Sequence, residues 1–235
     1  MIKLSRDLTG KIRFIIDQFI PPILRDQKWF MLIPFKIIFQ DKSDIFLNFK
    51  QKAYQLSEKE FSHIYEIVGA DEWRQTDLNV GSIQKILGNI KGKTVLEVGC
   101  GKGYLAKMLA EKYLVTASDI MIDSKLTSGG SKLKFKVANI EFLPFRNKEF
   151  DTVVTTHTLE HIRNINKAIS ELRRVARKRL IIVVPKQRPY LYTFDLHLHF
   201  FPYLHSLLTT MTSGSKIKSI CQEIEHDLYY QEDRE

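Results

Sequence analysis

The chain is organised around Thr94-Val95-Leu96-Glu97-Val98-Gly99-Cys100-Gly101-Lys102-Gly103-Tyr104-Leu105. A run of mostly β-forming residues leads into glycines at alternate positions, and a helical pattern follows at once. Glycine lacks a Cβ atom, so it can adopt positive φ angles and let a ligand approach the backbone closely. The stretch therefore predicts a strand over 94–98, a tight turn that binds a ligand, and a helix over about 104–112.

The charge at this turn narrows the choice of ligand. Glu97 stands two residues before the first glycine, where a carboxylate repels the pyrophosphate of a dinucleotide, although Lys102 offsets part of that repulsion. The spacing is Gly-x-Gly-x-Gly, not the Gly-x-Gly-x-x-Gly of dinucleotide sites. Both features favour a cationic ligand without phosphate, and S-adenosylmethionine, with its ammonium and sulfonium groups, meets that description.

An acidic residue follows the next predicted strand, which covers 114–118. Asp119 comes about twenty positions after the glycines, where a carboxylate accepts hydrogen bonds from the two hydroxyls of a ribose. A helix cap or a turn residue is the alternative interpretation. Ile120 and Met121 come next, and apolar side chains there are suited to packing against an adenine ring.

Three further motifs follow, and together with the glycine loop they resemble a known family. They are Leu143-Pro144-Phe145, then Phe150-Asp151, and then Leu159-Glu160-His161 after a predicted strand over 152–156. With Glu97-x-Gly99-x-Gly101-x-Gly103 they are similar to the motifs of class I S-adenosylmethionine-dependent methyltransferases, in particular the branch called methyltransferase type 11. The resemblance runs from about residue 77 to about residue 208.

The resemblance implies a Rossmann-like, doubly wound, mostly parallel α/β sheet and S-adenosyl-L-methionine as cofactor. The residues before it predict a helical N-terminal extension. The family usually carries Asp after its third strand, here predicted over 134–138. Asn139 stands there instead, and its amide can still accept and donate hydrogen bonds to adenine. The cofactor-binding residues that this predicts are Glu97, Gly99, Cys100, Gly101, Gly103, Asp119, Ile120, Asn139, Ile140 and Thr156.

Two histidines near the end of the fourth strand are candidates for a catalytic base. His157 or His161 could take a proton from an acceptor hydroxyl, because the reference pKa of histidine lies near neutral pH. The Leu-Glu-His turn is, however, common to family members with unrelated substrates, which favours a structural role for it and for Glu160.

The loop after the fifth predicted strand, 180–184, should border the acceptor pocket. Lys186, Arg188 and Tyr190 are candidate substrate contacts there, and Trp73 is another, from the polar entry to the catalytic domain. His197-x-His199 lacks a third ligand at suitable spacing, so no metal site is predicted. The sequence also predicts helices over 166–177 and 203–210 and one strand over 218–230, which gives six strands in all. The basic cluster over 173–179 is interpreted as a solvated face, with phosphate binding as the alternative.

The predicted domains are a helical extension over 1–76 and a catalytic domain over 77–235. Residues 12–39 are rich in large apolar side chains with interspersed lysine and arginine, and their prolines predict two or three short amphipathic helices. A cap over the core, membrane or lipid docking, and an oligomer interface are all open for this region. A helix is predicted over 43–68, with a capping box at Ser57 and Glu60.

The overall interpretation is a methyltransferase that acts on a small-molecule, glycan or lipid-linked acceptor, at oxygen. The net charge of +9 favours anionic partners. The sequence lacks an Asn-Pro-Pro-Tyr motif for methylation of amino groups on DNA bases and a suitably placed cysteine nucleophile for methylation of cytosine carbon, so nucleic acid is not the favoured acceptor. A non-catalytic S-adenosylmethionine-binding or scaffold protein and an NAD-dependent oxidoreductase are the alternatives. Two distant cysteines, and no apolar run typical of a signal peptide or membrane span, favour the cytoplasm, with peripheral membrane contact as an option.

Overall fold

The computed structural model describes residues 15–16, 19–68, 76–123, 126, 130–212 and 218–234. The chain divides into two compact units: Met1–Gly69 with Pro189–Leu198, and Ala70–Arg188 with His199–Glu235. The boundary predicted at residue 76 stays a prediction, because residues 69–75, with Trp73 among them, lie outside the described residues.

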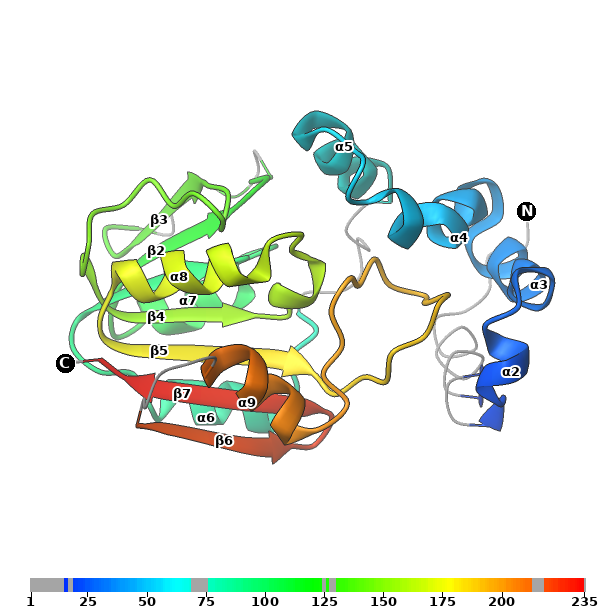
Figure 1. Ribbon diagram of the computed structural model, residues 1–235. Helices are drawn as coiled ribbons and strands as arrows, with labels where there is room; N and C mark the ends of the chain where they lie inside the picture. The colour runs from blue at the N-terminus through cyan, green and yellow to red at the C-terminus, as the bar shows by residue number, and fades with distance from the viewer. Residues whose placement is uncertain are drawn as a thin grey trace. The chain divides into compact units, whose positions relative to one another are not determined.

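The second unit is built on one sheet of seven strands (Figure 1). Their spatial order is β3-β2-β1-β4-β5-β7-β6. The first five strands pair in parallel, while β7 runs antiparallel to both β5 and β6. The strands are β1 (Thr94–Val98), β2 (Leu114–Asp119), β3 (Leu133–Val137), β4 (Phe150–Thr156), β5 (Ala176–Pro185), β6 (Ser219–Ile224) and β7 (Asp227–Asp233).

Helices cover both faces of this sheet (Figure 1). Neighbouring residues of a strand point to opposite faces, so Val153 of β4 packs with one core cluster and Val154 with the other. The first cluster includes residues of α8 (Ile165–Val175) and α9 (Leu204–Thr212), and the second includes residues of α6 (Val80–Leu87) and α7 (Tyr104–Ala110). This two-sided burial confirms the doubly wound α/β class.

The prediction of six strands was wrong at the end of the chain. The segment predicted as one strand is a hairpin, β6 and β7, in which Ile224 pairs with Asp227. Glu225 takes a φ of 55° in the turn. The turn lacks the glycine, asparagine or proline that ordinarily signals a hairpin, so the break was invisible in the sequence.

Each cation of the basic cluster over 173–179 pairs with a carboxylate. Arg173 pairs with Glu232, Arg174 with Glu171, Arg177 and Lys178 with Asp151, and Arg179 with Asp233. The ion pairs of this cluster tie α8 and β5 to neighbouring elements, while Arg177 and Lys178 remain about half exposed. Phosphate binding by the cluster stays a prediction.

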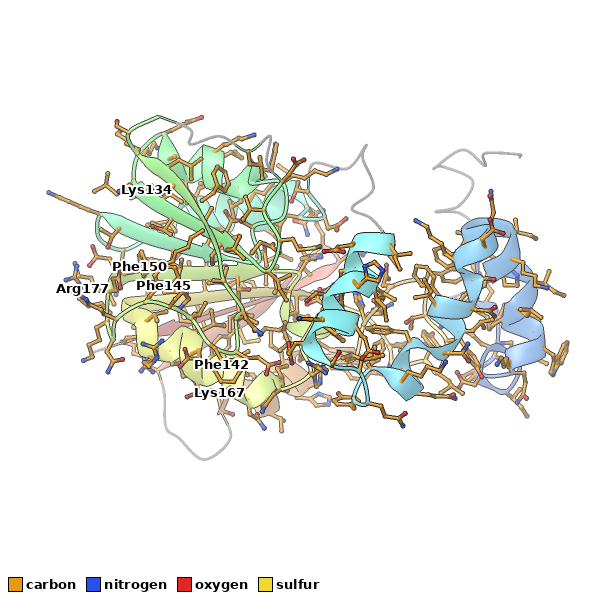
Figure 2. All side chains as sticks on the ribbon, turned by 90° about the horizontal axis from the view of Figure 1, so that it is seen from above. Lys134, Phe142, Phe145, Phe150, Lys167 and Arg177 are labelled. Atoms are coloured by element: carbon orange, nitrogen blue, oxygen red, sulfur yellow. The ribbon has the colours of Figure 1, made fainter. Side chains whose placement is uncertain are left out.

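The Phe150-Asp151 motif has a structural role at the start of β4. The ring of Phe150 meets that of Phe145 edge to face, with centroids 5.1 Å apart (Figure 2). Burial raises the pKa of Asp151, but the Lys93 amide and the side chains of Lys178 and Arg177 together hold it well below its usual range. Asp151 is thus an anchor for two cations and for the chain entering β1.

The first unit is helical. Its elements are α2 (Pro22–Arg25), α3 (Lys28–Phe39), the 3-10 turn η1 (Gln40–Lys42), α4 (Ser43–Lys52) and α5 (Glu58–Val68). The helix predicted over 43–68 is therefore two helices, and the capping box at the start of α5 is confirmed, because the Glu60 amide donates to Ser57 Oγ and the Ser57 amide donates to Glu60 Oε2.

Proline does not end α3, contrary to the prediction. Pro34 lies inside this helix, although it has no amide donor and its ring crowds the carbonyl four residues before it. Met31 and Phe35 of α3 are fully buried and pack with Tyr192 and Phe194 from the 189–198 segment. Within the described ranges, no helix is long and apolar enough to cross a bilayer.

Candidate functional site

Glycine is needed at the three positions of the loop for different physical reasons. All have positive φ angles: 77° at Gly99, 49° at Gly101 and 69° at Gly103. A Cβ on Gly99 would stand 2.0 Å from Thr158 Oγ1, and one on Gly103 would stand 2.8 Å from the ring of Phe135. A Cβ on Gly101 would meet nothing within 4 Å. Two glycines therefore permit packing, and Gly101 leaves its backbone open to a ligand.

Glu97 is a buried carboxyl at the end of β1. Its side chain is 2% exposed, and Oε2 lacks a hydrogen-bond partner among the described residues. Burial, and then the nearby Asp119, raise the pKa of Glu97 to about 8, although the amide of Ala106 opposes the shift. A cation brought near this carboxyl would favour its ionised form.

Asp119 joins the end of β2 to the open glycine of the loop. Its Oδ2 accepts from the Gly101 amide at 2.8 Å, and its Oδ1 accepts from the Met121 amide at 3.4 Å. Burial raises the pKa of Asp119, while these amides and the charge of His161 oppose the shift. The neighbouring Ile120 is 37% exposed, which leaves an apolar side chain available beside this carboxylate.

The other residues predicted to bind the cofactor are more enclosed. Asn139 Oδ1 accepts from the Glu141 amide at 2.8 Å. The side chains of Cys100, Ile140 and Thr156 are 6%, 5% and 8% exposed. Burial also raises the pKa of the Cys100 thiol. Their contacts to a ligand stay predictions.

His157 is paired with a carboxylate that sequence reasoning missed. Its Nε2 lies 2.9 Å from Asp227 Oδ1, and these side chains are 19% and 4% exposed. Asp227 Oδ2 accepts from Asn79 Nδ2 at 2.7 Å and from Ser82 Oγ at 2.8 Å. The backbone also holds His157, because its amide donates to the Val183 carbonyl and its φ is 49°.

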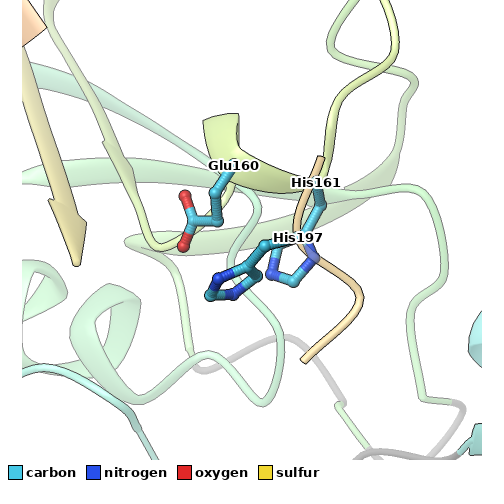
Figure 3. Close-up of side chains that lie close together, drawn as sticks. All are labelled: Glu160, His161 and His197. Atoms are coloured by element: carbon cyan, nitrogen blue, oxygen red, sulfur yellow. The ribbon is translucent and has the colours of Figure 1, made fainter. Parts of the chain in front are cut away.

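Glu160 and His161 follow on the 3-10 turn η2 (Leu159–His161), as Figure 3 shows. His161 is close enough to Asp119 for its charge to influence the pKa of that carboxyl. The carbonyl of Glu160 accepts from the His199 amide at 3.0 Å, and His199 Nε2 lies 2.8 Å from the carbonyl of Ile162. His199 therefore braces the turn, while His197 is a buried residue of the first unit.

The predicted substrate contacts belong to different parts of the chain. Lys186 pairs with Glu223 at 2.5 Å, and Arg188 is exposed. Tyr190 belongs to the first unit, where the guanidinium of Arg25 lies 3.0 Å from the centre of its ring. Trp73 lies outside the described residues. The role of all four in binding an acceptor stays a prediction.

The glycine loop, Asp119 and the turn after β4 share the carboxyl edge of the sheet. Strand order reverses between β1 and β4, and open α/β sheets bind ligands at such a reversal. The open Gly101 backbone, the Asp119 carboxylate and the buried, unpartnered Oε2 of Glu97 fit a cationic nucleoside such as S-adenosylmethionine. Glu97 would complement its charge, and Asp119 its ribose.

Known proteins are similar to the part of the chain that contains the glycine loop and the turn after β4. Residues 96–184 match the family model described as a methyltransferase domain. Ajmaline N-methyltransferase from Rauvolfia serpentina is 31% identical over 40% of this chain and 36% of its own length. Malonyl-[acyl-carrier protein] O-methyltransferase from Geobacter sulfurreducens is 35% identical over 34% of this chain and 33% of its own. The chain thus spans about a third of the length of these relatives.

A solved structure supports the fold. Magnesium protoporphyrin IX methyltransferase from Synechocystis PCC 6803, with bound S-adenosylhomocysteine, is similar with a TM-score of 0.51 and 20% identity. The match covers 76% of this chain and 95% of that one. With the matched motifs and the ligand edge described above, the chain carries a class I S-adenosylmethionine-dependent methyltransferase domain, for which S-adenosylmethionine is the cofactor.

Proposed function

We propose that the protein transfers a methyl group from S-adenosylmethionine to a hydroxyl oxygen of a small-molecule, glycan or lipid-linked acceptor. The observation that carries this proposal is the pair of His157 and Asp227 at the ligand edge of the sheet. His157 directly follows Thr156, the last residue of β4, and Asp227 opens β7 opposite Pro185, the last residue of β5.

The pair has the arrangement that a general base needs. When bound, the cofactor supplies a methyl group already activated by a sulfonium, so the protein has to position the acceptor and manage a proton. With Asp227 ionised, its oxygen favours the tautomer of His157 that carries hydrogen on Nε2. Nδ1 then holds the lone pair that can accept the acceptor's hydroxyl proton, and Asp227 stabilises the imidazolium that forms.

The backbone at His157 supports a functional interpretation. A residue other than glycine at a φ of 49° sits in the left-handed region, which costs roughly 1–3 kcal/mol and persists only where the surroundings impose it. The contacts that impose it here are the hydrogen bond from the His157 amide to the Val183 carbonyl and the pairing with Asp227. Asn79 and Ser82 hold Asp227 in turn.

A base favours oxygen as the methylated atom. A hydroxyl must lose its proton as it attacks, whereas a neutral amine attacks with its own lone pair and releases the proton afterwards. Relatives named as N-methyltransferases and as O-methyltransferases both match this chain, so the choice rests on the pair of His157 and Asp227 rather than on the likeness.

The test has two stages. Thermal unfolding is first followed with S-adenosylhomocysteine and, separately, with NAD. We expect only S-adenosylhomocysteine to stabilise the protein. Stabilisation by NAD alone would show that the cofactor assignment is wrong. Turnover of radiolabelled S-adenosylmethionine is then measured on matched hydroxyl and amine acceptors from small-molecule, glycan and lipid panels. Label in methyl ethers supports the proposal. Label only in amines contradicts oxygen, and cofactor binding without turnover on any acceptor favours a non-catalytic binding protein.

A further inference from the structure

Helix α3 is apolar on both its buried and its exposed side. Met31 and Phe35 lie at 0% exposure and face the core of the first unit. On the outside, Trp29, Ile33 and Ile37 are 64%, 61% and 51% exposed. These three recur every four residues and so form one stripe along the helix. A helix that is apolar all round normally has a second apolar surface against it.

The exposed apolar surface extends beyond α3. Phe19 is 70% exposed, and Ile23 and Leu24 of α2 are 77% and 39% exposed. Scattered single apolar residues are ordinary on a protein surface, but a concentration of large ones on consecutive elements marks an interaction site.

The charges on α3 have one sign. Lys28 and Lys36 are both exposed, and the helix has no acidic residue. Asp26, just before the helix, accepts a hydrogen bond from the Leu191 amide at 2.8 Å. Lys28 Nζ lies 3.3 Å from Asn48 Oδ1, a neutral group. The stripe is therefore flanked by cations with no carboxylate on the helix itself.

We propose that α2 and α3 form a docking surface for the face of a bilayer that contains anionic phospholipid. The stripe of Trp29, Ile33 and Ile37 would enter the boundary between headgroups and acyl chains, while Lys28 and Lys36 meet lipid phosphates. Exposed tryptophan with flanking lysine is typical of helices that lie in this interface. Twelve residues of helix are too short to span the hydrocarbon, so the helix lies along the surface.

The interspersed lysines favour a bilayer over a second copy of the chain. The core of a protein–protein interface is depleted in lysine, because a buried ammonium must be paired. At a bilayer, the long side chain of Lys36 can extend to the headgroups while its apolar neighbours remain inserted. The docking does not depend on methyl transfer, although it would bring the enzyme to a lipid-linked acceptor.

Flotation of the full chain with vesicles tests the proposal. Vesicles of phosphatidylcholine with about 30 mol% phosphatidylserine should carry the wild-type protein upward in a density gradient. A variant with Trp29→Gln, Ile33→Gln and Ile37→Gln should bind at least tenfold more weakly. Failure of the wild type to float, or equal flotation of this variant, would overturn the proposal.

A matched control separates this surface from general hydrophobicity. Leu114, Val137 and Ile220 are 53%, 62% and 51% exposed on strands of the second unit. Replacing all three by Gln removes a similar set of exposed apolar groups and should leave flotation unchanged. An equal loss in this control would overturn the assignment to α3. Circular dichroism spectra and the affinity for S-adenosylhomocysteine should be the same in all variants, which shows that each variant is folded. If no variant and not even the wild type binds S-adenosylhomocysteine, the cofactor assignment is wrong, and the flotation result is judged separately.

The charges provide a second, independent variant. Lys28→Glu with Lys36→Glu should weaken binding to the anionic vesicles by at least about 25-fold, since each lysine near an anionic surface contributes about fivefold. Lys107→Glu with Lys134→Glu, at exposed positions of α7 and β3, is the control and should reduce binding far less. Light scattering tests whether the stripe instead binds a second copy of the chain. If the wild type forms a dimer and does not float, and the variant with Trp29→Gln, Ile33→Gln and Ile37→Gln is a monomer, the stripe is a dimer interface and docking to a bilayer is wrong.

Discussion

Nε2 of His157 and Oδ1 of Asp227 lie 2.9 Å apart although 70 positions separate the two residues. The parallel β4 brings the histidine to the ligand edge at its end, and the antiparallel β7 brings the aspartate to the same edge at its start. A loop could not hold such a pair as firmly, because both residues adjoin strands of the central sheet and Asp227 is also fixed by α6.

His157→Ala should lower kcat by roughly 100-fold or more, since general-base removal typically costs a factor of 10² to 10⁴. The affinity for S-adenosylhomocysteine should change little, because the His157 side chain is not among the predicted cofactor contacts. Steady-state kinetics and calorimetry measure the two effects. His63→Ala is the matched control, since His63 lies 3.0 Å from Glu66 in a similar pair at an exposed position of α5. Unchanged kcat in His157→Ala would remove the base from the mechanism.

Asp227→Asn should preserve His157 but disturb its tautomer, because an amide can donate where the carboxylate only accepts. A fall in kcat is expected, together with a pH–rate profile whose acidic limb moves, as loss of the carboxylate disfavours the imidazolium. The midpoint temperature of thermal unfolding should fall by only a few degrees, since an amide oxygen can still accept hydrogen bonds from Asn79 and Ser82. A uniform loss of activity with an unmoved profile would indicate that Asp227 is only structural.

Gly99→Ala and Gly101→Ala should separate folding from binding. A Cβ at Gly99 overlaps Thr158, so this variant should lose several kcal/mol of stability, beyond the roughly 1–3 kcal/mol of a strained φ. Gly101→Ala meets open space and should lose only the φ strain, yet it should weaken cofactor binding because the methyl group occupies the approach to the backbone. Chemical denaturation and calorimetry give both quantities. If Gly101→Ala binds as the wild type does, the loop is not the cofactor's cradle.

Asp119→Ala should weaken S-adenosylhomocysteine binding by about 1–3 kcal/mol, the cost of leaving hydrogen-bonding partners unsatisfied. The variant also frees the Gly101 amide that Asp119 now holds, so a second measurement in denaturant is needed to separate lost order in the loop from lost ligand contact. Glu111→Ala, at the exposed end of α7, removes one carboxylate without touching the loop. Equal affinities in Asp119→Ala and the wild type would exclude a ribose role.

Local patterns were sufficient to predict the central sheet but not its edge. The strand, turn and helix around Gly99 follow from residue types within a dozen positions, and the structure confirms them. The hairpin after Ile224 was missed because its turn, Glu225-His226, depends on contacts from elsewhere: Asn79 Nδ2 donates to the carbonyl of Ile224 at 3.1 Å and to Asp227. Such long-range support leaves no mark in the local sequence.

The same limit applies to the candidate site and to α3. His157 was identified because it follows a strand, but its partner stood in the hairpin that was read as one strand. Pro34 was predicted to break a helix, yet the burial of Met31 and Phe35 outweighs the loss of one hydrogen bond. In each case packing between distant segments decided the outcome, whereas propensity describes only near neighbours.

Glu97→Gln should stabilise the ligand-free protein increasingly as pH rises. The pKa of Glu97 is raised by burial from 4.5 to about 8, so above about pH 4.5 the unfolded chain releases a proton that the folded chain keeps. Folding of the wild type therefore loses stability from about pH 4.5 to about pH 8, by on the order of 5 kcal/mol, and is flat beyond. Glutamine carries no such proton and keeps an oxygen for the Ala106 amide. The difference in unfolding free energy between variant and wild type, measured by chemical denaturation from pH 5 to 9, should grow and then level off near pH 8, whereas Glu111→Gln should show no such trend. A difference independent of pH would mean that burial does not raise the pKa of Glu97.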